Sequence, residues 1–263
     1  MTDAPTFPLY MIQLQPDAIR AGLWMAHEGL SRQGADDGYG WHALLKAAFG
    51  DLAPKPFRII EHARKPLQLL AYSQADEAAL RDQAAAFAAP VVVAALNLPS
   101  LAVKRMPNSF AAGQRFGFEV RIRPTIRQHP AGDRTRSRER DAFLAAIEKA
   151  GPREARAEID RVAVYTEWLR GHLEKHGARL IGAQPLALRR TRVSRRNGER
   201  HLVSNIEGPD CTFSGGLEVV QPNAFRGLLA RGVGRHRTFG FGMLLLRPYT
   251  GSINGAVRSS RAR

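Results

Sequence analysis

The alternation of hydrophobic and polar residues along the chain predicts strands interspersed with helices. The clearest strand covers residues 115–123, where every second residue from Phe116 to Ile122 is apolar and most residues between them are charged. Further strands are expected at residues 7–14, 57–62, 66–73, 101–106, 187–194, 199–205, 212–220 and 241–247. Helices are expected at residues 17–32, 39–49, 75–88, 138–149, 157–176 and 223–230.

The order of these elements indicates the fold class. Each half of the chain contains about four strands and two helices in an order close to βαββαβ. We therefore expect an α+β protein of two tandem ferredoxin-like (RRM-like) domains, at residues 1–127 and 128–248. The polar, charge-dense stretch 127–140 is expected to connect them, and residues 249–263, which lack periodicity, to form a flexible tail.

The composition is typical of a folded globular protein, with 44% hydrophobic residues among 263. Cys211 is the only cysteine, which excludes an internal disulfide and a cysteine-based metal site and favours a reducing compartment. The longest apolar run, residues 84–96, is too short to cross a bilayer and contains Pro90. We expect a cytoplasmic protein with no membrane partner.

The charge balance points to a polyanionic partner. Lys and Arg number 39 against 24 Asp and Glu, which gives a net charge of +15. Such an excess favours nucleic acid, with an anionic membrane surface as the weaker alternative. Arginine predominates, and its planar guanidinium pairs with phosphate and stacks on bases. A bias in codon usage explains the choice of arginine over lysine but does not explain the net charge.

A glycine-rich stretch near the end, GVGRHRTFGFGMLLLRP at residues 232–248, joins backbone freedom to positive charge. It lacks the GxxxxGK(S/T) spacing of a P-loop and the GxGxxG spacing of a dinucleotide site, and no second HxT motif completes a phosphodiesterase site. Its amides and cations suit a phosphate backbone. The expected contacts are Gly232, Gly234, Arg235, Arg237, Gly240 and Gly242. The alternative is a tight connection in which the glycines serve turn geometry alone.

The expected hairpin at residues 188–201 is dense in arginine, and its Asn197-Gly198 pair is a strong two-residue turn signal. This density suits the backbone of an RNA stem. The residues expected to bind RNA there are Arg189, Arg190, Arg192, Arg195 and Arg196. The alternative is a solvated, mobile finger.

Three segments together resemble the CasE family, the precursor-RNA endoribonucleases of type I-E CRISPR systems. The glycine-rich stretch resembles the family's C-terminal signature, GQRFGFEVRIRPTIR at residues 113–127 its central strand, and PKPFRII at residues 54–60 a further family segment. Residues 121–124 depart slightly from the family's spacing. The resemblance implies binding of the CRISPR repeat hairpin, retention of the mature crRNA, and association with other subunits of the type I-E surveillance complex.

The family's catalytic motif is YxxH, which Tyr39 and His42 match. His27 follows Trp24 at the same spacing, but without the tyrosine. The family order places the motif directly before PFRII, which favours His42 and leaves residues 17–37 as an insertion of unknown role. The resemblance implies His42 as general acid or base and Tyr39 as a group that positions or protonates the phosphate region, without a metal or cofactor. The products would carry a 2′,3′-cyclic phosphate and a 5′-OH.

Helical spacing supports this choice independently. Tyr39, His42 and Lys46 fall on one flank of the short helix, beside a stripe of apolar residues. Lys46 is a candidate phosphate stabiliser on this geometry. Two histidines one turn apart, His172 and His176, lack a third ligand and fit a charged helix surface better than a metal site.

Two rival functions use the same positive charge. A noncatalytic RNA-binding protein of two RRM-like domains would stack bases on aromatic residues, but residues 115–120 match the RNP1 pattern only weakly. A basic ribosome-associated or membrane-surface protein is supported by charge alone.

Overall fold

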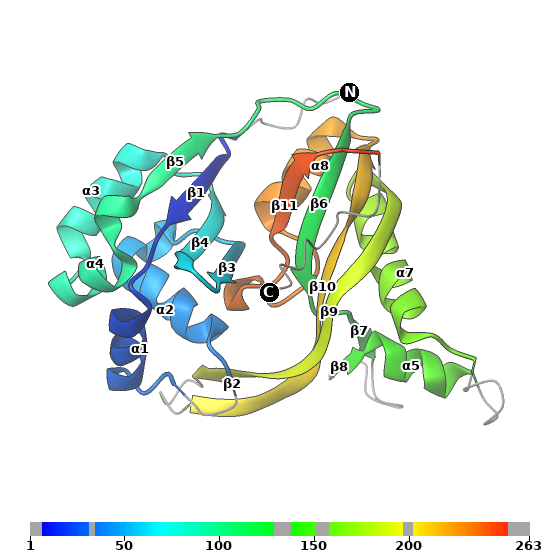
Figure 1. Ribbon diagram of the computed structural model, residues 1–263, viewed down its shortest axis with the longest axis horizontal. Helices are drawn as coiled ribbons and strands as arrows, with labels where there is room; N and C mark the ends of the chain where they lie inside the picture. The colour runs from blue at the N-terminus through cyan, green and yellow to red at the C-terminus, as the bar shows by residue number, and fades with distance from the viewer. Residues whose placement is uncertain (1–6, 32–34, 129–137, 151–157, 197–201, 252–263) are drawn as a thin grey trace, which may run out of the picture.

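The computed structural model describes residues 7–31, 35–128, 138–150, 158–196 and 202–251 (Figure 1). An antiparallel four-stranded sheet of order β3-β4-β1-β5 forms the first domain. Its strands are β1 (Tyr10–Leu14), β3 (Phe57–His62), β4 (Lys65–Ser73) and β5 (Ala102–Arg105). Since the first strand of the domain lies between its third and its fourth, this is the ferredoxin-like arrangement of a βαββαβ unit.

Helices cover one face of this sheet. They are α1 (Ala18–His27), α2 (Gly38–Phe49), α3 (Glu77–Phe87) and α4 (Pro90–Leu96), with 3₁₀ turns η1 (Gly50–Leu52) and η2 (Leu98–Ser100). Asp17 and Asp76 cap α1 and α3, because their carboxylates accept hydrogen bonds from backbone N–H groups of the first turn. A cluster of buried side chains, including Ile12, Leu44 and Leu80, joins the helices to the sheet.

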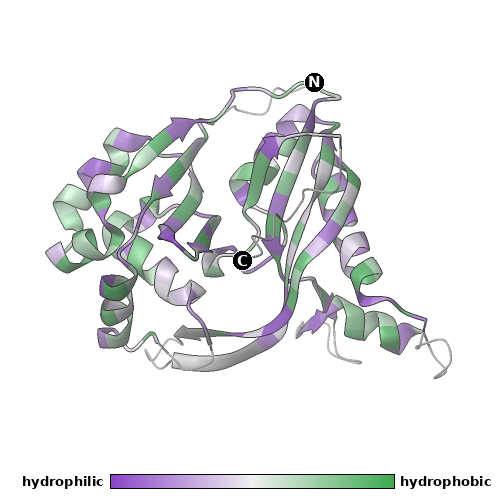
Figure 2. Ribbon diagram, in the orientation of Figure 1, coloured by the Kyte–Doolittle hydropathy of each residue, from purple (hydrophilic) through white to green (hydrophobic). Residues whose placement is uncertain are grey.

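The second domain repeats this arrangement, with sheet order β11-β6-β10-β9 extended by β2. Its strands are β2 (Ala35–Asp36), β6 (Arg115–Ile122), β9 (Ala178–Arg196), β10 (Leu202–Val219) and β11 (Leu244–Pro248), and its helices α5 (Ala142–Lys149), α7 (Arg161–Glu174), α8 (Pro222–Arg231) and the 3₁₀ turn η3 (Arg237–Phe239). β7 (Thr125–Gln128) and β8 (Arg138–Asp141) pair separately. Hydrophobic and hydrophilic residues alternate along the strands of this five-stranded sheet (Figure 2). The predicted pair of ferredoxin-like domains is confirmed.

The change from one sheet to the other lies before the predicted boundary at residue 127. That boundary assigns β6 to the first domain, yet β6 is hydrogen-bonded to β10 and β11. Alternation along a strand indicates which face is buried but not which strand lies beside it, so the pattern could not place β6. By sheet membership the second domain begins at Arg115, and the predicted connection at 127–140 overlaps the β7–β8 pair, with residues 129–137 outside the described part.

The hairpin of β9 and β10 is longer than predicted, with strands of 19 and 18 residues. The predicted strand at 187–194 lies within β9, and those at 199–205 and 212–220 overlap β10, with residues 199–201 outside the described part. Gly208 and Pro209 lie between the two predicted strands that overlap β10. The predicted Asn197-Gly198 turn lies between β9 and β10, outside the described residues. Register shifts along the pair bend the hairpin. Its far end runs below α1 and α2 in Figure 1 and reaches β2.

Two local predictions also differ from the structure. The predicted helix at 138–149 begins as β8, whose residues pair with β7. The helix α4 was not predicted, because its opening residue, Pro90, also marks a break in the apolar run. Proline is favourable there, since the first residue of a helix needs no N–H donor.

Apolar and polar contacts join the two domains. Leu9 and Tyr72 of the first domain are buried in the core of the second. The Tyr72 hydroxyl donates to the carbonyl oxygen of Leu244 at 3.0 Å. Arg58 on β3 pairs with Glu119 on β6 at 2.8 Å. These contacts fix the side of the first domain that faces the C-terminal segment.

Candidate functional site

Helix α2 carries the two residues selected for proton transfer, Tyr39 and His42. Its apolar stripe is buried in the first-domain core as predicted, with Leu44, Leu45 and Ala48 fully inaccessible to solvent. Tyr39 and His42 lie half-buried on the flank and Lys46 is exposed. The Tyr39 ring lies 5.8 Å from the Phe239 ring, measured between centroids. This flank of α2 therefore contacts the glycine-rich loop, defined here as residues 232–243.

The surroundings of His42 favour its neutral form. Burial lowers the pKa of His42 below its ordinary value near 6.5, and the positive charges of Lys55 and Lys46 lower it further. Its Nδ1 atom is buried and has no hydrogen-bond partner among the described residues. At pH 7 the ring is therefore more completely neutral than a free imidazole and can accept a proton.

Two lysines lie near this ring. Lys46 Nζ is 3.2 Å from Asp51 Oδ1, in a pair so exposed that it contributes little to stability, so Lys46 can turn to an incoming phosphate. Lys55 precedes β3 and was not selected from the sequence. A single lysine in a loop carries no spacing signal, and only the fold brings it close to His42.

The alternative histidine lies elsewhere on the domain. His27 ends α1, its side chain is 84% exposed, and its Nδ1 atom is 3.5 Å from Glu28 Oε1. Residues 17–37, which the resemblance left as an insertion, form α1 and β2, with residues 32–34 outside the described part. Of the two candidate histidines, His42 belongs to the helix that contacts the glycine-rich loop.

The glycine-rich loop is closed on itself and tied to β6. Val233 N–H donates to the Gly242 carbonyl at 2.8 Å, and Gly242 N–H donates to the Arg121 carbonyl at 2.7 Å. The predicted glycines have positive φ angles, at Gly232, Gly234, Gly240 and Gly242. A β-carbon on Gly242 would lie 2.5 Å from the Val233 carbonyl oxygen. Turn geometry and packing therefore suffice to explain Gly242, whose amide is already in use.

The basic residues of the loop have partners that the sequence did not indicate. Arg235 Nε lies 2.8 Å from Glu139 Oε1, and His236 Nε2–H donates to Glu139 Oε2 at 2.6 Å. The hydrogen bond from His236 lowers the pKa of Glu139, against the opposing effect of burial, and the charge of Arg235 adds to the shift. Arg237 donates to the Arg231 carbonyl oxygen at 2.6 Å, which leaves its charge uncompensated by that bond.

A cleft with a volume of about 640 Å³ lies between this loop and the first domain. Lys55 lines it from one side and Arg231, Arg235 and Arg237 from the other, with Asp51 as the acidic residue of the lining. Convergence of cations from both domains gives the cleft a positive potential. It can accommodate a phosphate-bearing chain next to η1, the turn that follows α2.

The structure divides the predicted hairpin arginines between acidic partners on β10. Arg190 and Arg192 donate to Glu207 at 3.1 and 3.3 Å, whereas Arg189 donates to Asp210 at 2.9 Å. Their side chains remain 45%, 64% and 60% exposed for Arg190, Arg192 and Arg189. The three can therefore still contact a partner at the surface.

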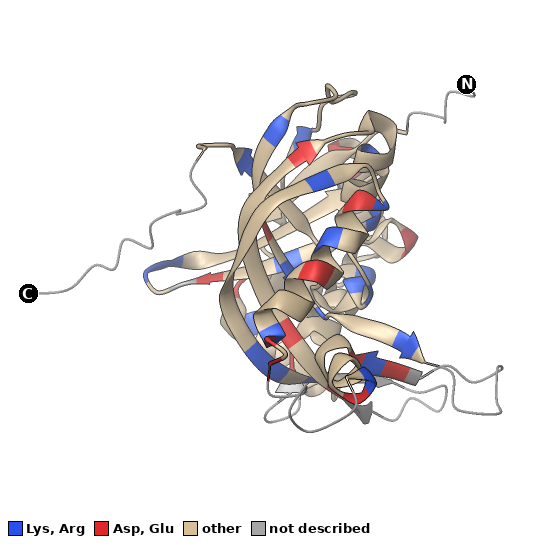
Figure 3. Cartoon of the chain, turned by 90° about the vertical axis from the view of Figure 1, so that its right-hand side faces the viewer, with Lys and Arg blue, Asp and Glu red and all other residues tan. Residues whose placement is uncertain are grey.

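The remaining two arginines, Arg195 and Arg196, lie in β9 with their backbones opposite Val203 and Leu202, and their side chains are outside the described part. In the view of Figure 3, basic and acidic residues are interspersed along the ribbon of the second domain. The cleft lining is a cluster in which cations of both domains come together.

Among the described residues, no group of three or more His, Cys, Asp and Glu side chains could hold a metal ion. The His172 ring is stacked on Trp168, with ring centroids 3.7 Å apart, and its Nδ1 atom lies 2.9 Å from the Trp168 carbonyl oxygen. No helix in the described part is long and apolar enough to span a bilayer.

Comparison with known proteins gives one family and one fold. Residues 9–248 match a family model described as CRISPR associated protein. No curated protein matches the chain in sequence.

Solved structures with the same fold cover nearly the whole chain. Cse3 of Thermus thermophilus, bound to an RNA representing a pre-cleavage complex, is 19% identical with a TM-score of 0.59 over 92% of this chain and 100% of that one. Cas6e of Escherichia coli K-12 is 14% identical with a TM-score of 0.55 over 91% of this chain and 100% of that one. A chain from a CRISPR RNA-guided surveillance complex is 15% identical with a TM-score of 0.52 over 91% of this chain and 100% of that one.

Proposed function

We propose, because the chain belongs to the family of CRISPR-associated proteins, that it is an endoribonuclease that cleaves CRISPR precursor RNA at the repeat hairpin. One observation carries the proposal. The helix with Tyr39 and His42 contacts the glycine-rich loop through Tyr39. Lys55, whose charge acts on His42, lines a cleft that carries cations from both domains, although neither Tyr39 nor His42 is among its lining residues. A histidine close to a lysine of a positively charged cleft can supply the proton transfer and the phosphate binding that RNA cleavage through the 2′-OH requires.

The chemistry follows from the residues of this flank. The ribose 2′-OH attacks the adjacent phosphorus, the bond to the 5′-oxygen breaks, and the products end in a 2′,3′-cyclic phosphate and a 5′-OH. His42, neutral at pH 7, takes the proton from the 2′-OH or, once protonated, gives one to the leaving oxygen. Tyr39 positions the phosphate region.

Negative charge on the phosphorane is offset by lysine side chains in this proposal. Lys55 lines the cleft. Lys46 can turn toward a phosphate bound there when it leaves its exposed pair with Asp51. In other nucleases a divalent metal stabilises this negative charge. Because the lysines stabilise it here, cleavage is metal-independent in this proposal.

The RNA partner and its retention follow from the same proposal. The structures of similar fold include Cse3 bound to RNA and a chain of a CRISPR RNA-guided surveillance complex. We propose that this chain binds the repeat hairpin, keeps the mature crRNA and joins the other subunits of such a complex. The exposed arginines of the β9–β10 hairpin and the loop cations Arg235 and Arg237 supply the phosphate contacts.

A cleavage assay tests the proposal. The purified protein is incubated with a labelled repeat hairpin in EDTA, and with magnesium in a parallel reaction. Equal cutting in both reactions supports a metal-independent endoribonuclease. Binding without cutting in either reaction would instead make the protein a noncatalytic RNA-binding protein.

The pKa of His42 gives a prediction for the RNA-free protein. Its ring should titrate below the ordinary value near 6.5, and Lys55→Met should raise its pKa, because a nearby positive charge disfavours the protonated ring. A proton NMR pH titration measures both, with the His42 resonance identified by its loss in His42→Ala. Lys104→Met, which removes an exposed lysine on β5, should leave it unchanged. A pKa at or above the ordinary value, or one insensitive to Lys55→Met, contradicts the described environment.

The hairpin gives a prediction about RNA affinity. The double variant Arg190→Gln and Arg192→Gln should reduce the slope of log affinity against log salt by about 2, roughly one unit per lost phosphate contact. Filter binding at several salt concentrations measures the slope. The control is Arg115→Gln with Arg179→Gln, because these two arginines share Glu218 at the other end of the hairpin in a matching arrangement. An equal loss in both double variants would show a nonspecific charge effect.

A further inference from the structure

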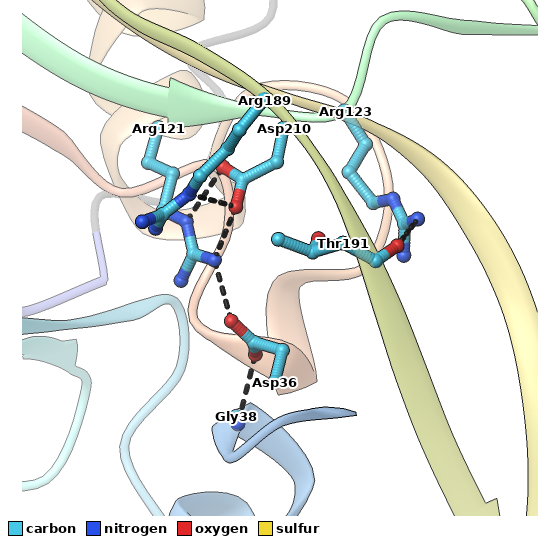
Figure 4. A network of polar contacts seen from close by, with 7 residues as sticks. All are labelled: Asp36, Gly38, Arg121, Arg123, Arg189, Thr191 and Asp210. Carbon is cyan, nitrogen blue, oxygen red and sulfur yellow. Dashed lines mark hydrogen bonds and ion pairs between the residues drawn. The ribbon is translucent and has the colours of Figure 1, made fainter. Parts of the chain in front are cut away.

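A network of four charged side chains connects the start of helix α2 to the middle of the β9–β10 hairpin (Figure 4). Arg121 on β6 lies at its centre. Its Nε and Nη2 atoms donate to the two carboxylate oxygens of Asp210 at 2.9 and 2.6 Å, and Nη2 also donates to Asp36 Oδ2 at 2.5 Å. Arg189 donates to Asp210 from the hairpin at 2.9 Å. Arg121 donates to both carboxylates, so the four side chains link β6, the hairpin and the segment that precedes α2.

Three of the four side chains are shielded from solvent, whereas that of Arg189 is exposed. The side chain of Asp210 is 1% exposed, and those of Arg121 and Asp36 are 14% and 12% exposed. Burial alone would lower the pKa of Arg121, but the hydrogen bonds and charges of Asp210 and Asp36 outweigh it and raise that pKa. The guanidinium also lies 4.3 Å from the centroid of the Phe241 ring in the glycine-rich loop. Fork geometry and burial together fix the orientation of this arginine.

Asp36 connects Arg121 to the first turn of α2. Its Oδ1 atom accepts a hydrogen bond from Gly38 N–H, the first residue of the helix, at 2.9 Å. Its backbone pairs with Val193 of the hairpin through β2. On the other side, a β-carbon on Gly38 would lie 2.2 Å from the Phe239 carbonyl oxygen, so the helix start is in close contact with η3. The first turn of α2, which includes Tyr39, is thus held between the hairpin and the glycine-rich loop.

We propose that Asp36 and Arg121 are positioning residues for RNA cleavage, which hold Tyr39 and His42 in register with RNA bound along the hairpin. This inference rests on the proposed function. It gives a role to residues 35 and 36, at the end of the segment 17–37 that the resemblance left as an insertion. These two residues attach the catalytic helix to the second domain. Neither residue touches the RNA in this arrangement.

Three variants test whether Asp36 and Arg121 position α2 or only join the two domains. Asp36→Asn keeps an oxygen for Gly38 N–H but loses the charge that pairs with Arg121. Arg121→Lys keeps the charge but loses the fork that joins Asp36 to Asp210. Glu119→Gln is the matched control, because the Arg58–Glu119 pair also joins the two domains, at 2.8 Å and partly buried, but connects β3 to β6 rather than α2 to the hairpin.

The measurement compares catalysis with binding. Single-turnover rate constants are measured at saturating protein, and affinity is measured with a repeat RNA in which 2′-deoxy nucleotides prevent cleavage. We expect Asp36→Asn and Arg121→Lys to lower the rate constant about tenfold or more, since small misplacement of a catalytic group is costly, with affinity changed less than about threefold. The pH midpoint of the rate should not move, because neither residue transfers a proton. Glu119→Gln should change neither quantity.

Three other outcomes would overturn the proposal. Unchanged rate constants in both variants would remove the positioning role. A shifted pH midpoint would make Asp36 part of the proton transfer instead. A lower amplitude of the cleavage reaction with an unchanged rate constant, together with lower thermal stability, would show only that part of the protein is unfolded. Failure of the proposed function is distinguishable from all of these, because the wild-type protein would then not cut the repeat at all.

Discussion

Replacing His42 with alanine is expected to lower the single-turnover rate constant of repeat cleavage by about 100-fold or more, as loss of a general acid or base does. The imidazole is half-buried on the flank of α2 that also carries Tyr39, and its neutral form is favoured at pH 7. Affinity for a 2′-deoxy repeat should change by less than about threefold, because phosphate contacts elsewhere dominate binding. Gel-based cleavage assays and filter binding measure the two quantities.

His27→Ala is the matched control for that experiment. His27 has the same residue type and the same spacing from an aromatic residue, but its side chain is 84% exposed at the end of α1. We expect cleavage by this variant to equal that of the wild type. Loss of activity in His27→Ala with retention in His42→Ala would assign the catalytic histidine to α1 and contradict the site described above.

Replacing Gly242 with alanine is expected to destabilise the fold by about 3 kcal/mol. The left-handed conformation of residue 242, with φ 81°, costs an alanine roughly 1–2 kcal/mol. Its β-carbon would also lie 2.5 Å from the Val233 carbonyl oxygen, and such overpacking costs about 1–3 kcal/mol. Thermal and urea unfolding measure the change.

Replacing Gly22 with alanine is expected to have the opposite effect on stability. Gly22 lies within α1, and a β-carbon there would meet nothing within 4 Å. Alanine should stabilise the helix by about 0.5–1 kcal/mol. If Gly242→Ala kept its stability but weakened RNA binding, the glycine would serve phosphate contact, as the sequence alone first suggested, and not loop closure.

The sequence was informative wherever local periodicity decides structure. The two βαββαβ units, the buried stripe of α2 and the exposure of Lys46 all follow from the spacing of apolar residues. The placement of β6 does not, because its pattern fits either sheet and its partners β10 and β11 lie far along the chain. The length of the β9–β10 hairpin was missed for a related reason, since Gly208 and Pro209 interrupt its alternation.

The site was predictable only in part for the same physical reason. Tyr39 and His42 share one helix, so their relation follows from helical geometry. Glu139, which pairs with Arg235 and His236, and Asp36, which pairs with Arg121, act through contacts between residues about 85 to 97 positions apart in the chain. No spacing rule covers such distances, and only the fold shows which of the predicted cations already have a carboxylate partner.

The chemical nature of the RNA ends tests the central claim most directly. Mass spectrometry of the upstream fragment, cut by the wild-type protein in EDTA, distinguishes a 2′,3′-cyclic phosphate from a linear phosphate or a free 3′-OH. We predict the cyclic phosphate, paired with a 5′-OH on the downstream fragment, because attack by the ribose 2′-OH with proton transfer by His42 yields no other primary product. A free 3′-OH next to a 5′-phosphate, or cutting that appears only when magnesium is added, would contradict it.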